Sequence, residues 1–163
     1  KLGIDRISKP SRKNVKVKWA NPDIINDNKF LKTLAAKSHK HEQRMQIQIA
    51  TYLKLKHPEI IFYSDVASGC KLTIGQAVIN RKMQYSRALP DMFIAEIRKE
   101  KGGLFLEFKK DINEICCKDG TLRKDKHIIE QNEMLIKLRN KGYSAHFACG
   151  FDDAINIIEN YLN

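Results

Sequence analysis

Two charged residues stand two positions apart in a short apolar segment of this 163-residue chain. Residues 104–109 read LFLEFK and have strand character, and alternation along a strand places Glu107 and Lys109 on one face, opposite Phe108. A single charge that faces a protein core is costly, so the pair needs either solvent or a compensating charged group. Two interpretations follow: an edge strand with a simple ion pair on a wet face, or a metal site.

A second carboxylate precedes this pair. Asp91 follows Pro90 at the start of another short apolar segment, and the intervening KEKGG is a turn sequence, so residues 88–110 are predicted to form a hairpin. Pairing of the two strands brings Asp91 within reach of Glu107 at one end of the sheet. Two carboxylates with a backbone carbonyl between them form a hard-oxygen site that suits Mg²⁺ or Mn²⁺. A lysine beside such a site can orient and help to deprotonate a water and can stabilise charge on a phosphate.

Two predicted helices each carry a polar residue in an apolar stripe. Residues 41–56 have Glu42 at the N-terminal end of a stripe with helical spacing, which consists of Met45, Ile49, Tyr52 and Leu53. Either a favourable interaction with the helix dipole or a role inside a site explains Glu42. In residues 125–140, Gln131 occupies the line formed by Ile128, Leu135 and Leu138.

The remaining elements complete an alternating pattern. Residues 60–66 predict a strand, and Thr73 with Gln76 predicts a capping box that opens a helix to about Tyr85. A polar loop covers 111–124, residues 143–150 predict a strand, and Asp152 or Asp153 is expected to cap a last helix. The order is α, β, α, β, β, α, β, α. It predicts an α/β domain with a central mixed sheet flanked by helices.

The positive charge of the chain lies mostly in its first third. The net charge is +11, and residues 1–57 hold 14 Lys and Arg against 4 Asp and Glu, whereas residues 58–163 hold 16 against 15. Such a block attracts phosphate backbones without reading their sequence. We therefore expect a basic, partly flexible arm at 1–38 and a folded domain at 39–163. The four cysteines show no disulfide or CxxC spacing, and no apolar run is long enough to cross a membrane.

Taken together, these residues carry a resemblance to a known family. Pro90-Asp91 followed by Glu107-Phe108-Lys109 resembles the PD-(D/E)xK nuclease motif. The wider order, with Glu42 on the first helix and Gln131 on the helix after the motif, is similar to the VRR-NUC family of virus-type replication-repair nucleases, especially its small stand-alone phage and bacterial members. The resemblance covers about residues 40–162 and implies a restriction-endonuclease-like core.

The resemblance implies a role for each of these residues. Asp91 and Glu107 would be metal ligands, the Phe108 carbonyl would complete the protein's share, and the ion would be Mg²⁺, with Mn²⁺ able to substitute. Lys109 would be the catalytic lysine. Glu42 and Gln131 (both named above) would be catalytic as well: the first would hold a water on the metal or a second ion, and the second would orient the lysine or the scissile phosphate.

The resulting expectation is a metal-dependent DNA endonuclease that hydrolyses phosphodiester bonds. The resemblance further implies selectivity for branched DNA such as Holliday junctions, a homodimer, a role in replication, recombination or repair, and a cytoplasmic place in a bacterial cell or phage-infected host, with no membrane partner. A catalytically silent nucleic-acid-binding module of the same fold and an RNA-directed nuclease remain as alternatives. The basic residues expected to contact DNA are Arg81, Lys82, Arg87, Arg12, Lys13, Lys16 and Lys18.

Overall fold

A computed structural model describes residues 41–65 and 72–163 of the chain. The predicted basic arm and its boundary at residue 38 lie outside these ranges. The described elements are α3 (His41–Lys56), β1 (Phe62–Ser64), α4 (Ile74–Met83), β2 (Met92–Ile94), β3 (Leu104–Lys109), the 3₁₀ turn η2 (Ile112–Glu114), α5 (Lys126–Asn140), β4 (Ser144–Cys149) and α6 (Phe151–Leu162). Apart from the added 3₁₀ turn, this is the order that the sequence predicts.

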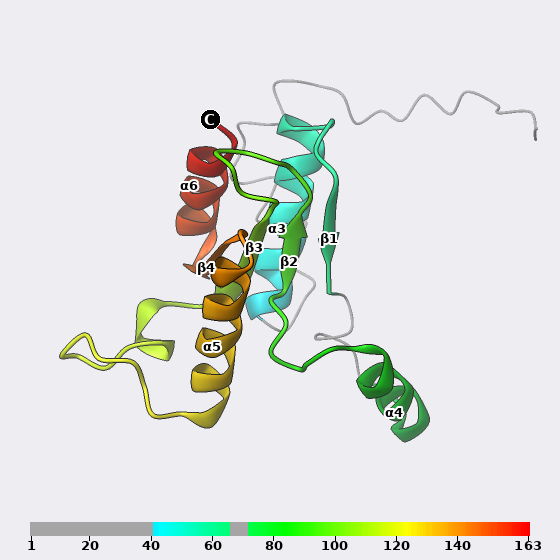
Figure 1. The fold of residues 1–163 in the computed structure, drawn as a ribbon, viewed down its shortest axis with the longest axis vertical. Helices are drawn as coiled ribbons and strands as arrows, with labels where there is room; N and C mark the ends of the chain where they lie inside the picture. Colours follow the sequence, from blue (N-terminus) through cyan, green and yellow to red (C-terminus); the bar gives the residue numbers. More distant parts are fainter. Residues whose placement is uncertain (1–40, 66–71) are drawn as a thin grey trace, which may run out of the picture.

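Four strands form one mixed sheet in the order β1-β2-β3-β4. β1, β2 and β3 pair antiparallel, whereas β3 and β4 pair parallel because α5 connects them. α3 and α6 cover one face of the sheet and α5 covers part of the other, as Figure 1 shows. The predicted α/β fold with a central mixed sheet is therefore confirmed, and its arrangement agrees with a restriction-endonuclease-like core.

Alternation along β3 divides the interior into two apolar clusters. Leu104, Leu106 and Phe108 are fully buried and pack with side chains of α3 and α6, whereas Phe105 faces α5 on the other side. The apolar stripe predicted for α3 belongs to the larger cluster, on the α3 and α6 side of the sheet, because Met45, Ile49 and Leu53 are buried there. Because β3 contributes to both clusters, its position is fixed from both faces of the sheet.

The predicted helix caps are confirmed at one helix and wrong at another. The Thr73 hydroxyl accepts from the Gln76 backbone N–H and the Gln76 side chain accepts from the Thr73 N–H, which is the predicted capping box. Asp125 caps α5 through its bonds to two backbone N–H groups. α6 instead begins after Gly150, which has φ +85° and no side-chain cap, while Asp153 reaches back and accepts from the Cys149 N–H at 2.8 Å.

Two other segments differ from the sequence-based expectation. β1 is shorter than the predicted strand 60–66, and the described part ends at residue 65. The loop at 111–124 has local structure, because Asp111 caps the η2 turn and Ile115 is buried beneath it. No helix among the residues that the structure describes is long and apolar enough to cross a membrane.

A cluster of polar groups ties the end of α3 to α6. The Glu159 carboxylate accepts from the Tyr52 hydroxyl at 2.6 Å, lies 2.7 Å from the His57 Nε2 atom and lies 3.5 Å from the Lys56 Nζ atom. Partial burial alone would raise the pKa of Glu159, but hydrogen bonds from Tyr52 and His57 and the charge of Lys56 outweigh burial and lower it to about 2.

We expect this cluster to stabilise the fold in a pH-dependent way. Because the folded pKa of Glu159 lies below its ordinary value of 4.5, the stabilisation is present above pH 4.5 and is lost as the pH falls towards 2. Glu159→Gln should lower the free energy of unfolding by about 2 kcal/mol at neutral pH. Urea midpoints of both proteins at neutral pH and at successively lower pH should converge; a gap that stays constant in acid would contradict this account.

Candidate active site

Glu107 and Lys109 form a buried ion pair on an interior strand. The Lys109 Nζ atom lies 2.9 Å from a Glu107 carboxylate oxygen, and each residue is only 4% exposed. β3 has β2 on one side and β4 on the other, so the edge-strand interpretation of this pair is wrong. Charged residues are almost never buried this deeply without partners, so the pair needs further compensating groups.

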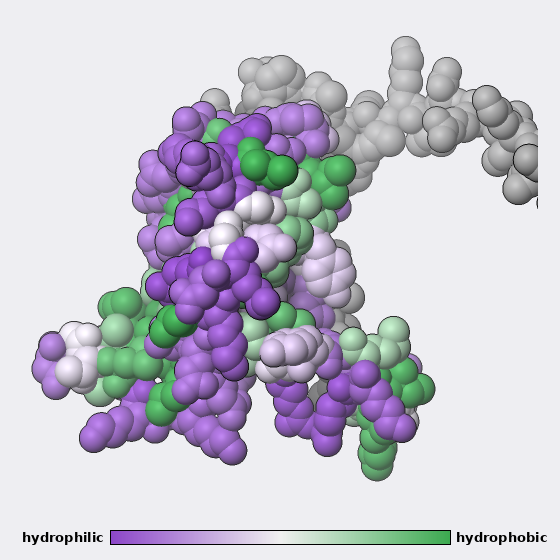
Figure 2. Space-filling model, in the orientation of Figure 1, coloured by the Kyte–Doolittle hydropathy of each residue, from purple (hydrophilic) through white to green (hydrophobic). Residues whose placement is uncertain are grey.

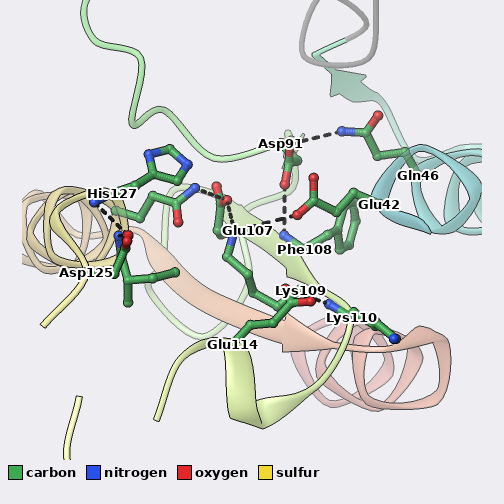
Figure 3. Close-up of polar contacts among 12 residues, drawn as sticks. Glu42, Gln46, Asp91, Glu107, Phe108, Lys109, Lys110, Glu114, Asp125 and His127 are labelled. Atoms are coloured by element: carbon green, nitrogen blue, oxygen red, sulfur yellow. Dashed lines mark hydrogen bonds and ion pairs between the residues drawn. The ribbon is translucent and has the colours of Figure 1, made fainter. Parts of the chain in front are cut away.

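Asp91 lies where the ladder between β2 and β3 stops. Met92 pairs with Leu106 as the last register pair, and beyond it the Asp91 Oδ2 atom accepts from the Phe108 N–H at 2.9 Å. The N–H and C=O of a strand residue point to the same neighbouring strand, so the Phe108 carbonyl also faces the Asp91 side. The two predicted ligands and the carbonyl therefore come together at one end of the sheet (Figure 3).

Both flanking helices contribute a residue that the sequence predicts. Gln131 on α5 is buried and donates from Nε2 to the Glu107 carboxylate, the same oxygen that Lys109 contacts. Glu42 in the first turn of α3 has a carboxylate oxygen 4.0 Å from the Lys109 Nζ atom, and its side chain is 55% exposed. Glu42 therefore lies on the rim of the site, whereas Gln131 lies inside it.

Burial gives both carboxyl groups unusual pKa values. Burial and, to a smaller extent, the charge of Asp91 raise the pKa of Glu107 to about 8, although Lys109 offsets part of this effect. Burial also raises the pKa of Asp91 to about 6, against the lowering effect of the Phe108 N–H and of Lys109. These raised pKa values mean that the site disfavours the charged forms of both carboxyl groups. The positive charge of Lys109 alone is therefore not enough to stabilise two carboxylates there.

The donor set fits a hard divalent cation. Two carboxylates and a backbone carbonyl are oxygen ligands of the kind that Mg²⁺ and Mn²⁺ prefer. Among the described residues, the buried Gln131 Oε1 atom has no hydrogen-bond partner, so the site leaves an acceptor that a water on a bound cation would satisfy. Within residues 41–65 and 72–163, no group of three or more His, Cys, Asp or Glu side chains gathers to hold a metal. The carboxylates available to a cation at this site are those of Asp91 and Glu107.

One residue of the site, Gln46, is not among those that the sequence predicts. This α3 residue is 7% exposed, and its Nε2 atom donates to the Asp91 Oδ1 atom at 3.0 Å. Both Asp91 oxygens therefore have a donor, Gln46 on one and the Phe108 N–H on the other. The spacing of Glu42, Gln46, Ile49 and Leu53 follows one line along a helix, and this line could have identified the residue.

We expect Gln46→Leu to impair the site without unfolding the domain. Leucine has a similar size, but it leaves the Asp91 Oδ1 atom without its donor, and loss of such outer partners lowers metal affinity or activity by about 10- to 100-fold. Metal affinity measured by calorimetry, together with cleavage rate, would check this. Gln48→Leu makes the same change two residues along the helix and is the matched control; equal effects of both variants would contradict a specific role for Gln46.

The basic residues predicted to contact DNA lie away from this network. Arg81 and Lys82 are exposed in the last turn of α4, and Arg87 is exposed in the segment that leads to β2. Figure 1 shows α4 standing apart from the sheet, at the end that carries the site. The other four predicted contacts lie outside the described residues: Arg12, Lys13, Lys16 and Lys18.

Comparison with known proteins gives a partial likeness among solved structures. No family model matches the chain, and no curated protein matches it. Among solved structures, a "VRR_NUC domain protein" is similar over 62% of this chain, with 25% sequence identity and a TM-score of 0.42. The chain spans 66% of that structure's own length, which is just under two thirds.

Proposed function

We propose that this domain is a metal-dependent DNA endonuclease that hydrolyses phosphodiester bonds. The observation that carries the proposal is the convergence of Asp91, Glu107, Lys109 and Gln131 at one end of the sheet. If Glu107 and Lys109 formed only a structural ion pair, the carboxylate of Asp91 would not be needed beside it. Nor would Gln131 need to donate a hydrogen bond to Glu107. Strongly raised carboxyl pKa values beside a buried lysine are typical of sites that hold a cation and carry out chemistry.

In this proposal Asp91, Glu107 and the Phe108 carbonyl hold Mg²⁺, for which Mn²⁺ substitutes. The chemistry that such an ion supplies is a lower pKa for water and neutralisation of charge on the phosphate. Lys109 is held beside the carboxylates by its bond to Glu107, so its ammonium group can orient the attacking water. The same charge stabilises the negative charge that develops on the phosphate during in-line attack.

The two helix residues have different roles in the proposed reaction. Gln131 and Lys109 both donate a hydrogen bond to the same Glu107 oxygen. Gln131 therefore fixes the position of the Glu107 carboxylate, and this carboxylate in turn orients Lys109. Glu42 is exposed at the rim and close to the Lys109 ammonium group, where its carboxylate can accept a proton or a hydrogen bond from water. Gln131 therefore acts as a positioning residue, and Glu42 contacts the water at the exposed edge of the site.

The charge distribution supports a nucleic acid as the substrate. Three exposed basic residues, Arg123, Lys124 and Lys126, surround the start of α5, the helix that carries Gln131. Together with the exposed cations near α4 and the basic first third of the chain, they provide positive charge for phosphate contacts. We include in the proposal selectivity for branched DNA, such as four-way junctions, and a homodimer with two active sites. Both rest on the resemblance to small stand-alone VRR-NUC nucleases.

The test is cleavage of labelled duplex, flap, single-stranded and four-way-junction DNA with Mg²⁺, with Mn²⁺ or with EDTA. The proposal requires cutting that depends on the metal, and the ranking of the four substrates tests selectivity. Binding of all four without cutting would support the silent module instead. Preferred cutting of an RNA hairpin over the matched DNA would support the RNA-directed nuclease, and light scattering of the protein would test the dimer.

A further inference from the structure

One face of the sheet carries a row of aromatic side chains. Tyr63 pairs with Phe93, and Phe93 pairs with Phe105, so the three rings lie on the same face of three adjacent strands. The Phe93 and Phe105 rings stack with their centroids 4.4 Å apart, and the Tyr143 ring meets Phe105 edge-on at 5.2 Å. The row therefore extends from the edge strand β1 to β3.

The inner part of this row is firmly packed. Gly103 has φ +152°, and a Cβ atom there would lie 2.4 Å from the Phe93 ring, so the glycine provides the space that the ring fills. Tyr143 contacts both phenylalanine rings edge-on, which is a favourable arrangement for aromatic groups. Phe93 is thus fixed in place opposite Tyr63 on the neighbouring strand.

The aromatic row lies beside the candidate active site. Phe105, Glu107 and Lys109 alternate along β3 and share one face, and Asp91 precedes Phe93 by two residues. Two residues along a strand span about 7 Å. This separation is comparable with the reach of a nucleotide from its phosphate to its base. A strand of DNA with a phosphate at the carboxylates can therefore place a base over this row.

In the described part of the chain, no helix covers this face at β1 and β2. α5 packs over β3 and β4, and Figure 1 shows it in front of β4 with β1 and β2 open beside it. Tyr63 is 64% exposed. Figure 2 shows pale and green residues over these two strands, between more hydrophilic surfaces. The open end of the aromatic row is thus accessible from the same side as Glu107 and Lys109.

We propose that Tyr63 is a stacking platform for one unpaired nucleobase next to the phosphate bound at Asp91, Glu107 and Lys109. The proposal rests on the nuclease function and adds a substrate class to it: DNA with an unstacked base beside the cleaved bond, as in a single strand, a flap or a branch point. Bases of an intact duplex already stack on each other and reach the platform only at the cost of unstacking. Every base has a π-face, so the platform imposes little sequence preference.

The test measures binding of a single-stranded oligonucleotide that carries one 2-aminopurine, beside a matched blunt duplex, with Ca²⁺ as the cation. Stacking on a tyrosine quenches 2-aminopurine fluorescence, so the readout does not depend on cleavage. Tyr63→Ala should weaken single-strand binding by about 10-fold and remove the quenching, with duplex binding unchanged, because stacking on one aromatic ring contributes about this much. Tyr63→Phe keeps the ring and should behave like the wild type.

A control variant separates stacking from a general loss of apolar surface. Ile97 is 75% exposed beyond the opposite end of β2 from Asp91, so Ile97→Ala should leave single-strand binding and quenching unchanged. If Tyr63→Ala is folded and still shows the binding and quenching of the wild type, the platform is overturned. The platform is also overturned if Tyr63→Ala and Ile97→Ala weaken single-strand binding equally. If the wild type cuts DNA with Mg²⁺ in those cases, only the platform fails. Tyr63-dependent quenching without any cutting would leave the platform standing and refute the nuclease.

Discussion

Lys109→Met is expected to lower the rate of DNA cleavage by about 10³-fold, within the range found for loss of a catalytic acid–base or electrostatic group. Methionine keeps the length and apolar stem of lysine and removes only the charged group that lies 2.9 Å from Glu107. Glu107 tolerates this loss because burial already favours its neutral form, with its pKa raised to about 8. The domain should therefore fold, and DNA binding should stay nearly unchanged.

Lys110→Met is the matched control for this prediction. Lys110 is the next residue, carries the same charge and is exposed, and in Figure 3 its side chain points away from Glu107. Single-turnover cleavage and DNA affinity should be measured for both variants under the same salt concentration. Lys109→Met should lose cleavage and Lys110→Met should retain it. Comparable cleavage by the two variants would show that Lys109 is not catalytic and would leave it as a structural partner of Glu107.

Most of the site could be predicted because its signals are local. The alternation in residues 104–109 places Glu107 and Lys109 on one face, and the structure confirms that they contact each other. Gln131 could be found because it interrupts an apolar line of α5, and a polar residue at a buried helical position needs a partner. In both cases, a residue that disagrees with its local pattern identifies the site.

Of the two features that the sequence did not reveal, one depends on a contact between distant elements and the other on a local turn. Gln46 donates to Asp91 across 45 positions of the chain, and nothing within its own helix indicates that acceptor. The start of α6 differs from the prediction for a local reason: Asp152 and Asp153 have the residue type of a cap, but Gly150 adopts the positive φ that turns the chain. Asp153 then bonds the Cys149 N–H, so its side chain reaches back across the turn.

Glu107→Gln is expected to abolish the stabilisation of the domain by divalent cations. A cation that binds only the folded protein adds about 2.7 kcal/mol at 100 times its dissociation constant. For a domain of this size, that corresponds to a rise in melting temperature of about 5–10 °C. The wild type should show this rise with Mn²⁺ or Ca²⁺. Glutamine preserves the size of Glu107 and an oxygen acceptor for Lys109 and Gln131, but it provides no negative charge for the ion.

Glu133→Gln removes the same charge from the exposed side of α5 and should keep the full metal-dependent rise. Melting curves of the three proteins with EDTA and with increasing metal concentration therefore separate a specific ligand from a general charge effect. An unchanged rise in Glu107→Gln would exclude Glu107 as a ligand. If the metal does not raise the melting temperature of the wild type, the buried carboxylates interact with Lys109 and do not bind a cation. Because this measurement requires no DNA, it tests the metal centre independently of the substrate and of the platform at Tyr63.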